Sequence, residues 1–143
     1  MKLPPHKLIT TQSDWHHCLK KLQAEPRLAI DLEANSMYAY REEVCLVQIT
    51  IPGQDYIIDP LGVPGLSGLG DIIQNPQIEK VFHAAEYDLT LLKRQFDWQL
   101  QNLFDTMWAA RILGYPRYGL ASMLGEVFGV KLNKRYQKSN WCK

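Results

Sequence analysis

The stretch RLAIDLEANS, residues 27–36, places two acids inside an apolar run. Its alternation predicts a β-strand, in which successive side chains point to opposite faces. Leu28, Ile30 and Leu32 then share a buried face, and Asp31 and Glu33 share the other. The two acids stand roughly 6–7 Å apart at their Cα atoms. Like charges at this distance repel each other, and partial burial strengthens the repulsion.

Three arrangements would stabilise this pair of carboxylates: one acid is protonated, a basic group lies between them, or a cation does. Oxygen ligands at this spacing suit Mg²⁺ or Mn²⁺ better than zinc. We therefore regard Asp31 and Glu33 as candidate ligands of a divalent metal.

Asp88 is a third candidate. It lies in a predicted helix, residues 85–96, on the stripe that faces the core together with Leu91 and Leu92. A carboxylate in such surroundings needs a partner, which is either a neighbouring turn that it caps or a cation. Acids at the end of a strand and near the start of a following helix can converge on one divalent site. Such sites hold a phosphodiester and activate water.

The rest of the chain predicts an α/β fold with a mixed sheet. Residues 44–51 are apolar on both faces except Gln48 and Thr50, which is typical of a central strand. The other expected strands are 28–33, 55–59 (a hairpin with 44–51) and 80–84. The expected helices are 13–24 with Ser13 as N-cap, a short one near 65–74, and 85–96, 105–113 and 119–129.

Charge is distributed unevenly along the 143 residues. Residues 1–126 hold 11 Lys/Arg and 15 Asp/Glu, a net of −4, whereas residues 127–143 hold five basic residues and no acid, a net of +5. The basic residues are Lys131, Lys134, Arg135, Lys138 and Lys143. This segment also carries Tyr136 and Trp141, so it is either a phosphate-backbone contact or a solvated tail.

Length allows one domain, residues 1–143. Three cysteines without a CxxC pair (Cys18, Cys45 and Cys142) predict free thiols rather than a disulfide framework or a zinc site. No apolar run approaches the length of a membrane span, and the N-terminus has no signal-like apolar core. We expect a cytoplasmic protein that does not enter a membrane.

The segments AIDLEANS, EEVCLVQI, YIIDP, VFHAAEYDLTLL, LFDTMWAARILG and YGLASMLGEVFGVKLNKRYQKSNW follow the order and spacing of the ribonuclease D family. This family belongs to the DEDD superfamily of 3′→5′ exonucleases, and the resemblance covers about residues 8–143. It implies a ribonuclease H-like mixed sheet flanked by helices. It also implies two Mg²⁺ or Mn²⁺ ions held by Asp31, Glu33 and Asp88, with Asp31 bridging the metals and Glu33 orienting the attacking water.

Four further residues match substrate-binding positions of the family. Ala34 and Met37 occupy the segment that holds the terminal nucleotide, and His83 and Tyr87 flank the second motif acid. Asp105 matches a position that we interpret as a structural helix cap.

The chain departs from the family at the third motif, because no Tyr-x-x-x-Asp follows the SNW tripeptide, residues 139–141. We therefore expect a C-terminally incomplete domain without its last helix, with an exposed apolar C-terminal face. Such a face would allow self-association. The expected function is trimming of RNA from its 3′ end, as in tRNA-precursor processing, on a single-stranded 3′ end. The alternatives are a catalytically impaired nucleic-acid-binding fragment, a DNA-directed 3′→5′ exonuclease, and a purely structural domain.

Overall fold

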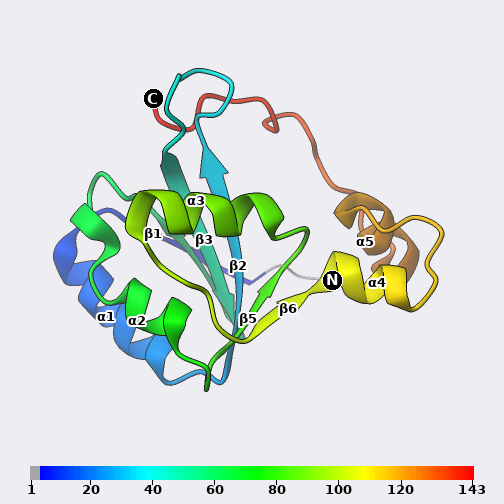
Figure 1. Ribbon diagram of the computed structural model, residues 1–143, viewed down its shortest axis with the longest axis horizontal. Helices are drawn as coiled ribbons and strands as arrows, with labels where there is room; N and C mark the ends of the chain where they lie inside the picture. The colour runs from blue at the N-terminus through cyan, green and yellow to red at the C-terminus, as the bar shows by residue number, and fades with distance from the viewer. Residues whose placement is uncertain (1–3) are drawn as a thin grey trace.

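The computed structural model describes residues 4–143 and contains a six-stranded mixed sheet in the order β1-β4-β3-β2-β5-β6 (Figure 1). The central strand β3 runs antiparallel to both β2 and β4, whereas β5 and β6 run parallel to β2. The strands are β1 (His6–Ile9), β2 (Arg27–Ala34), β3 (Val44–Ile51), β4 (Gln54–Ile58), β5 (Glu79–Phe82) and β6 (Leu103–Asp105). The predicted α/β class, the mixed sheet and the central position of residues 44–51 are thus confirmed.

Helices surround the sheet unevenly. They are α1 (Gln12–Gln23), α2 (Leu69–Gln74), α3 (Glu86–Phe96), α4 (Thr106–Ile112) and α5 (Leu120–Phe128), with a 3₁₀ turn at Pro64–Leu66. The first three contribute large buried side chains to the core, among them Trp15, Ile72 and Leu91. In Figure 1, α3 lies across the sheet, whereas α4 and α5 project beyond its β6 edge. None of the helices in residues 4–143 has the length and apolarity that crossing a membrane requires.

The alternation predicted for β2 is present. Leu28, Ile30 and Leu32 are buried, whereas Ala29 and Asp31 on the other face are exposed. The same face continues onto β3, where Thr50 pairs with Ala29 and Gln48 pairs with Asp31. One face of the sheet therefore carries the core, and the other is open in the middle of the molecule.

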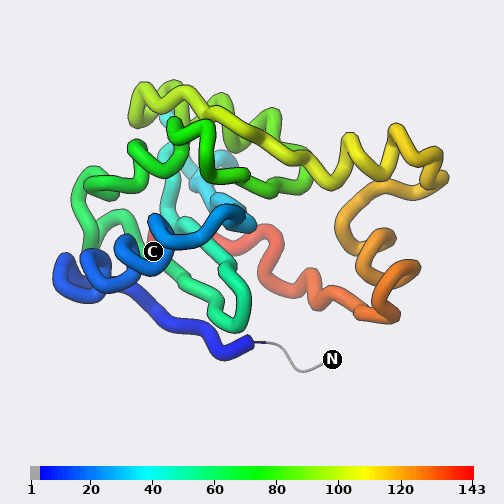
Figure 2. The backbone as a smooth tube through the Cα atoms, turned by 90° about the horizontal axis from the view of Figure 1, so that it is seen from below, coloured from blue at the N-terminus to red at the C-terminus, as the bar shows by residue number. Residues whose placement is uncertain are grey.

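Helices α4 and α5 carry exposed apolar side chains. Helix α5 has no buried residue, and Ile112 and Phe128 are 82% and 63% exposed. Figure 2 shows this helical pair reaching away from the body before the chain returns to it.

Two edge strands and one cap differ from the prediction. Strands β1 and β6 were not predicted, because four and three residues at the sheet edges are too short to show a periodic pattern. Ser13 was wrong as the N-cap of α1: the cap is Thr11, whose hydroxyl accepts a hydrogen bond from the Asp14 amide at 3.2 Å. The other predicted elements are present with ends shifted by up to a few residues.

The prediction of three free thiols was wrong. Cys45, near the start of β3, forms a disulfide with Cys142, and only Cys18 is free among the described residues. The two bonded cysteines are 97 positions apart in sequence but 4.9 Å apart at their Cα atoms. A pairing over this distance leaves no local signal, because it depends on the chain returning from α5 to the sheet.

The loop that contains Gly62 lies directly against the backbone of Thr10, which connects β1 to α1. A Cβ atom added to Gly62 would collide with the backbone carbonyl of Thr10, whereas one added to Gly119 would meet nothing within 4 Å. Gly62→Ala should therefore lower the free energy of unfolding by about 2 kcal/mol, and Gly119→Ala should change it by less than about 0.5 kcal/mol. Urea unfolding of both variants measures the difference. Equal free energies of unfolding for the two variants would contradict this prediction, because they would show that the backbone accommodates the added methyl group beside Thr10 without destabilising the fold.

Candidate active site

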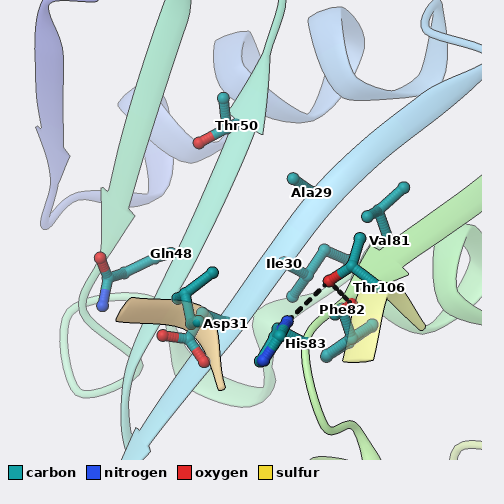
Figure 3. A pocket seen from close by; sticks show the side chains of 10 residues that line it. Ala29, Ile30, Asp31, Gln48, Thr50, Val81, Phe82, His83 and Thr106 are labelled. Carbon is teal, nitrogen blue, oxygen red and sulfur yellow. Dashed lines mark hydrogen bonds between the residues drawn. The ribbon is translucent and has the colours of Figure 1, made fainter. Parts of the chain in front are cut away.

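Glu33 lines a separate pocket together with residues of α5, whereas Asp31 of β2 opens onto a pocket of about 310 Å³ on the uncovered face of the sheet. Asp31 lines it together with Gln48 and Thr50 of β3 and with His83 beyond β5 (Figure 3). Although part of Asp31 is exposed, burial by the pocket wall raises the pKa of its carboxyl, against smaller lowering effects from the Leu32 amide and from His83. Burial also raises the pKa of Glu33, and the negative charge of Asp31 adds to this effect. For both acids, the net effect of these surroundings is to raise the pKa of the carboxyl group.

Asp88 lies in the first turn of α3 and is only 7% exposed, as its place on the core-facing stripe predicts. Burial raises the pKa of this carboxyl to about 7, and the charges of Asp31, Glu33 and Asp105 contribute in the same direction. No hydrogen bond or basic neighbour among the described residues acts in the opposite direction. The interpretation of Asp88 as a satisfied cap of a neighbouring turn therefore has no support in the structure.

Asp105 behaves in the opposite way. Its carboxylate accepts hydrogen bonds from the amides of Ala84 (3.0 Å), Ala85 (2.8 Å), Met107 (2.9 Å) and Trp108 (3.4 Å). Burial raises its pKa, but these four amides outweigh burial and lower the pKa below its usual value. The predicted role of Asp105 as a helix cap is confirmed for α4. The same carboxylate also fixes the turn that leads into α3.

That turn contains an unusual backbone conformation. Ala84 has a φ of +60°, in the left-handed region that residues with a Cβ rarely adopt. Such conformations persist only where the surroundings impose them, and here the Ala84 amide is bound by Asp105. Sequence reasoning gave no indication of this strain, since Ala84 resembles any helix former.

His83 has a defined orientation. Its Nδ1 lies 2.8 Å from Oγ1 of Thr106, and that hydroxyl donates to the carbonyl of Phe82 at 3.1 Å. Because the hydroxyl proton is directed at Phe82, Nδ1 is the donor, and a neutral ring then carries its lone pair on Nε2. The Nε2 atom is buried and has no partner among the described residues. Figure 3 shows the ring beside Asp31.

The remaining candidate residues are dispersed. Ala34 ends β2 where the pairing with β3 shifts register, and Met37 lies in the following loop, 66% exposed. Tyr87 faces a separate pocket that it shares with Trp108 of α4. Their substrate-binding roles stay predictions.

The acids fit a cation by their chemistry. Burial raises the pKa values of all three carboxylates, and neighbouring acids add to this effect at Glu33 and Asp88. Together they form an oxygen-only donor set, which is the kind that Mg²⁺ and Mn²⁺ prefer. Within residues 4–143, however, no three side chains of His, Cys, Asp or Glu already converge closely enough to hold a metal ion. The donor atoms therefore suit these metal ions in kind, but in this structure the three acids are not close enough together to form a complete binding site.

The fold defines a class: a ribonuclease H-like α/β exonuclease domain built on a mixed sheet. The chain belongs to the 3′-5′ exonuclease family, whose model matches residues 6–143.

Known proteins of this family are similar along almost the whole chain. The exosome complex exonuclease RRP6 of Saccharomyces cerevisiae is 34% identical over 93% of this chain, and ribonuclease D of Gluconacetobacter diazotrophicus is 33% identical over 96%. The chain spans 18% and 36% of the length of these two relatives.

Solved structures agree with this assignment. The catalytic core of RRP6 from Trypanosoma brucei superposes with a TM-score of 0.92 at 34% identity, covering 100% of this chain and 40% of that one. Escherichia coli RNase D superposes with a TM-score of 0.89 at 31% identity, covering 97% and 37%. The resemblance to the ribonuclease D family is thereby confirmed, as is the ribonuclease H-like fold.

Asp105→Ala should lower the free energy of unfolding by about 3 kcal/mol at neutral pH, because four amides lose a charged acceptor. The lowered folded-state pKa means that this stabilisation is present above the unfolded value of 3.8 and is lost as the pH falls through the folded value. Urea unfolding against pH measures it, and the exposed Asp71→Ala on α2 serves as control. A deficit that does not shrink in acid would contradict the role of the charge.

Asp88→Asn should have the opposite effect in metal-free buffer. With a folded-state pKa of about 7, against 3.8 unfolded, the folded chain binds more protons between these values, so stability falls as pH rises through this window. The Asn amide does not ionise, so the variant does not lose this stability. It should be more stable than the parent by about 2 kcal/mol near pH 8, with little difference near pH 4. The measurement is urea unfolding in EDTA, with Glu86→Gln, an exposed acid of the same helix, as the control. A parent more stable than Asp88→Asn near pH 8 would mean that Asp88 has a partner.

Proposed function

We propose that this chain is the catalytic module of an exoribonuclease that hydrolyses phosphodiester bonds from the 3′ end of RNA with the help of divalent cations. The observation that carries the proposal is a group of three acids with raised pKa values in a ribonuclease D-like fold: Asp31 and Glu33 on β2, and the buried Asp88 in the first turn of α3. A structural role for these acids would predict partners that neutralise them, as the amides around Asp105 do.

Asp31, Glu33 and Asp88 would hold Mg²⁺ or Mn²⁺, two ions by analogy with the family. When bound, such ions activate water and stabilise the leaving oxygen of the phosphodiester. Glu33 would orient the attacking water. His83, held by Thr106, offers its buried Nε2 lone pair as a hydrogen-bond acceptor beside Asp31. Ala34, Met37 and Tyr87 would contact the terminal nucleotides.

RNA is favoured over DNA by the relatives. E. coli RNase D is an exoribonuclease involved in structured RNA processing, and the yeast relative is an exonuclease of the exosome complex. Trimming of a single-stranded 3′ end, as in tRNA precursors, is the activity that we assign to this chain. Discrimination between RNA and DNA depends on contacts to the 2′-hydroxyl group, so a DNA-directed exonuclease is the outcome that a DNA control would reveal.

A second candidate is nucleic-acid binding with little hydrolysis. It is favoured by one structural observation: within residues 4–143, no three side chains of His, Cys, Asp or Glu converge closely enough to hold a metal ion. Because three such side chains do not yet converge within residues 4–143, this candidate predicts weak Mn²⁺ binding and slow hydrolysis.

The test is a time course on 5′-labelled single-stranded RNA and DNA with Mn²⁺, with Asp31→Asn beside the parent and Glu86→Gln as the control. We expect a ladder that shortens from the 3′ end of RNA in the parent and control. Asp31→Asn should be slower by at least about 100-fold, because the metals lose a ligand. Thermal unfolding with and without Mn²⁺ reports the metal separately: a concentration tenfold above the dissociation constant adds about 1.4 kcal/mol to the parent and nothing to Asp31→Asn.

Equal rates for Asp31→Asn and the parent would refute the site. Intact RNA in every lane, with Mn²⁺ still stabilising the parent and RNA still bound, would favour the second candidate.

A further inference from the structure

The segment after α5 crosses back over the molecule without forming a helix or strand. We call residues 131–142 the basic strap. Figures 1 and 2 show it running from α5 to the sheet, where the chain ends. Two contacts hold it there: Tyr38 donates a hydrogen bond to the carbonyl of Lys138 at 2.7 Å, and the disulfide joins Cys142 to Cys45 of β3. The strap is thus fixed at its far end, next to the loop that follows the acids of β2.

The strap forms a wall of a pocket that reaches one of these acids. This pocket, of about 520 Å³, has Glu33 of β2 in its lining, and α5 contributes Leu120. From the strap come Leu132, Asn133, Lys134, Tyr136, Gln137 and Trp141. The size lies in the range of small-ligand sites. A nucleotide placed here would lie between an acid of the candidate active site and a basic surface.

The charges of the strap are not neutralised. Its basic residues are Lys131, Lys134, Arg135 and Lys138. It contains no acid, and no carboxylate of residues 4–143 forms a salt bridge with these side chains. The guanidinium of Arg135 lies 5.6 Å from the ring centre of Tyr136. Cations for the phosphates and aromatic rings for the bases are the two components of single-strand binding surfaces.

Resting on the function proposed above, we propose that the basic strap binds the RNA strand that leads into the active site, with Lys134 and Arg135 on its phosphates, and that the Cys45–Cys142 disulfide keeps the strap in place. Reduction by a dithiol transfers two electrons and two protons to the disulfide, leaving two thiols and the oxidised, cyclic reductant. The hydrogen bond from Tyr38 to Lys138 remains, but the covalent anchor is lost, so ordering the strap around RNA costs more conformational entropy.

The charge arm of the test uses fluorescence anisotropy of a labelled single-stranded RNA in EDTA, where hydrolysis does not interfere. The double variant Lys134→Gln/Arg135→Gln should bind about tenfold more weakly than the parent. The slope of log K against log salt should become shallower by about 0.7 for each phosphate that the variant no longer neutralises. The matched control is Lys20→Gln/Lys21→Gln on α1, which lies away from the strap in Figure 1 and should bind like the parent.

The redox arm compares the oxidised parent, the parent treated with a dithiol, and Cys142→Ser. The last two should bind equally, about threefold or more below the oxidised parent, and the dithiol should not affect Cys142→Ser. Equal binding by oxidised and reduced parent would overturn the role of the disulfide. If the parent binds RNA and Lys134→Gln/Arg135→Gln binds it equally well, the proposed role of the strap is refuted and the exonuclease proposal is not affected. A parent that does not bind RNA would overturn both.

Discussion

The carboxylate of Asp105 is the contact on which the arrangement of this site depends. It accepts four backbone amides, two at the start of α4 and two at the turn into α3. By doing so it holds Ala84 in a left-handed conformation and sets the direction in which α3 leaves the sheet. Asp88 lies in the first turn of the helix that follows this turn, and His83, just before Ala84, is held in addition by Thr106. An acid that does no chemistry thus positions one that we expect to do it.

The neighbouring acids show how environment separates structural from functional carboxylates. Asp105 accepts hydrogen bonds from four amides, and its pKa falls. Asp88 has no donor within residues 4–143, and its pKa rises to about 7. A fold selected for stability alone would have replaced Asp88 by an apolar or amide side chain. Proteins retain such a residue, which lowers the stability of the fold, where a functional site requires it.

The sequence was sufficient for the centre of the fold and for the position of its acids. The alternation across residues 28–33 placed Asp31 and Glu33 on one face, and helical spacing placed Asp88 against the core; both follow from short-range geometry. The edge strands β1 and β6 could not be predicted, because four and three residues are too few to show an alternating pattern of apolar and polar side chains. The disulfide, the strained Ala84 and the separate pocket of Tyr87 depend on how distant segments meet, and no local pattern encodes that.

The bridge between Cys45 and Cys142 has a consequence for the denatured chain as well. With 97 positions between its ends, it closes a ring that includes most of β3 and every element that follows it. In the chain-entropy model, closing a ring of roughly 100 residues lowers the entropy of the unfolded chain and so raises its free energy by about 4.7 kcal/mol. That amount approaches the whole stability of an average small domain. Oxidised and reduced molecules with the same native contacts would therefore have very different lifetimes against proteolysis, and the redox state of its surroundings would govern how long this chain persists.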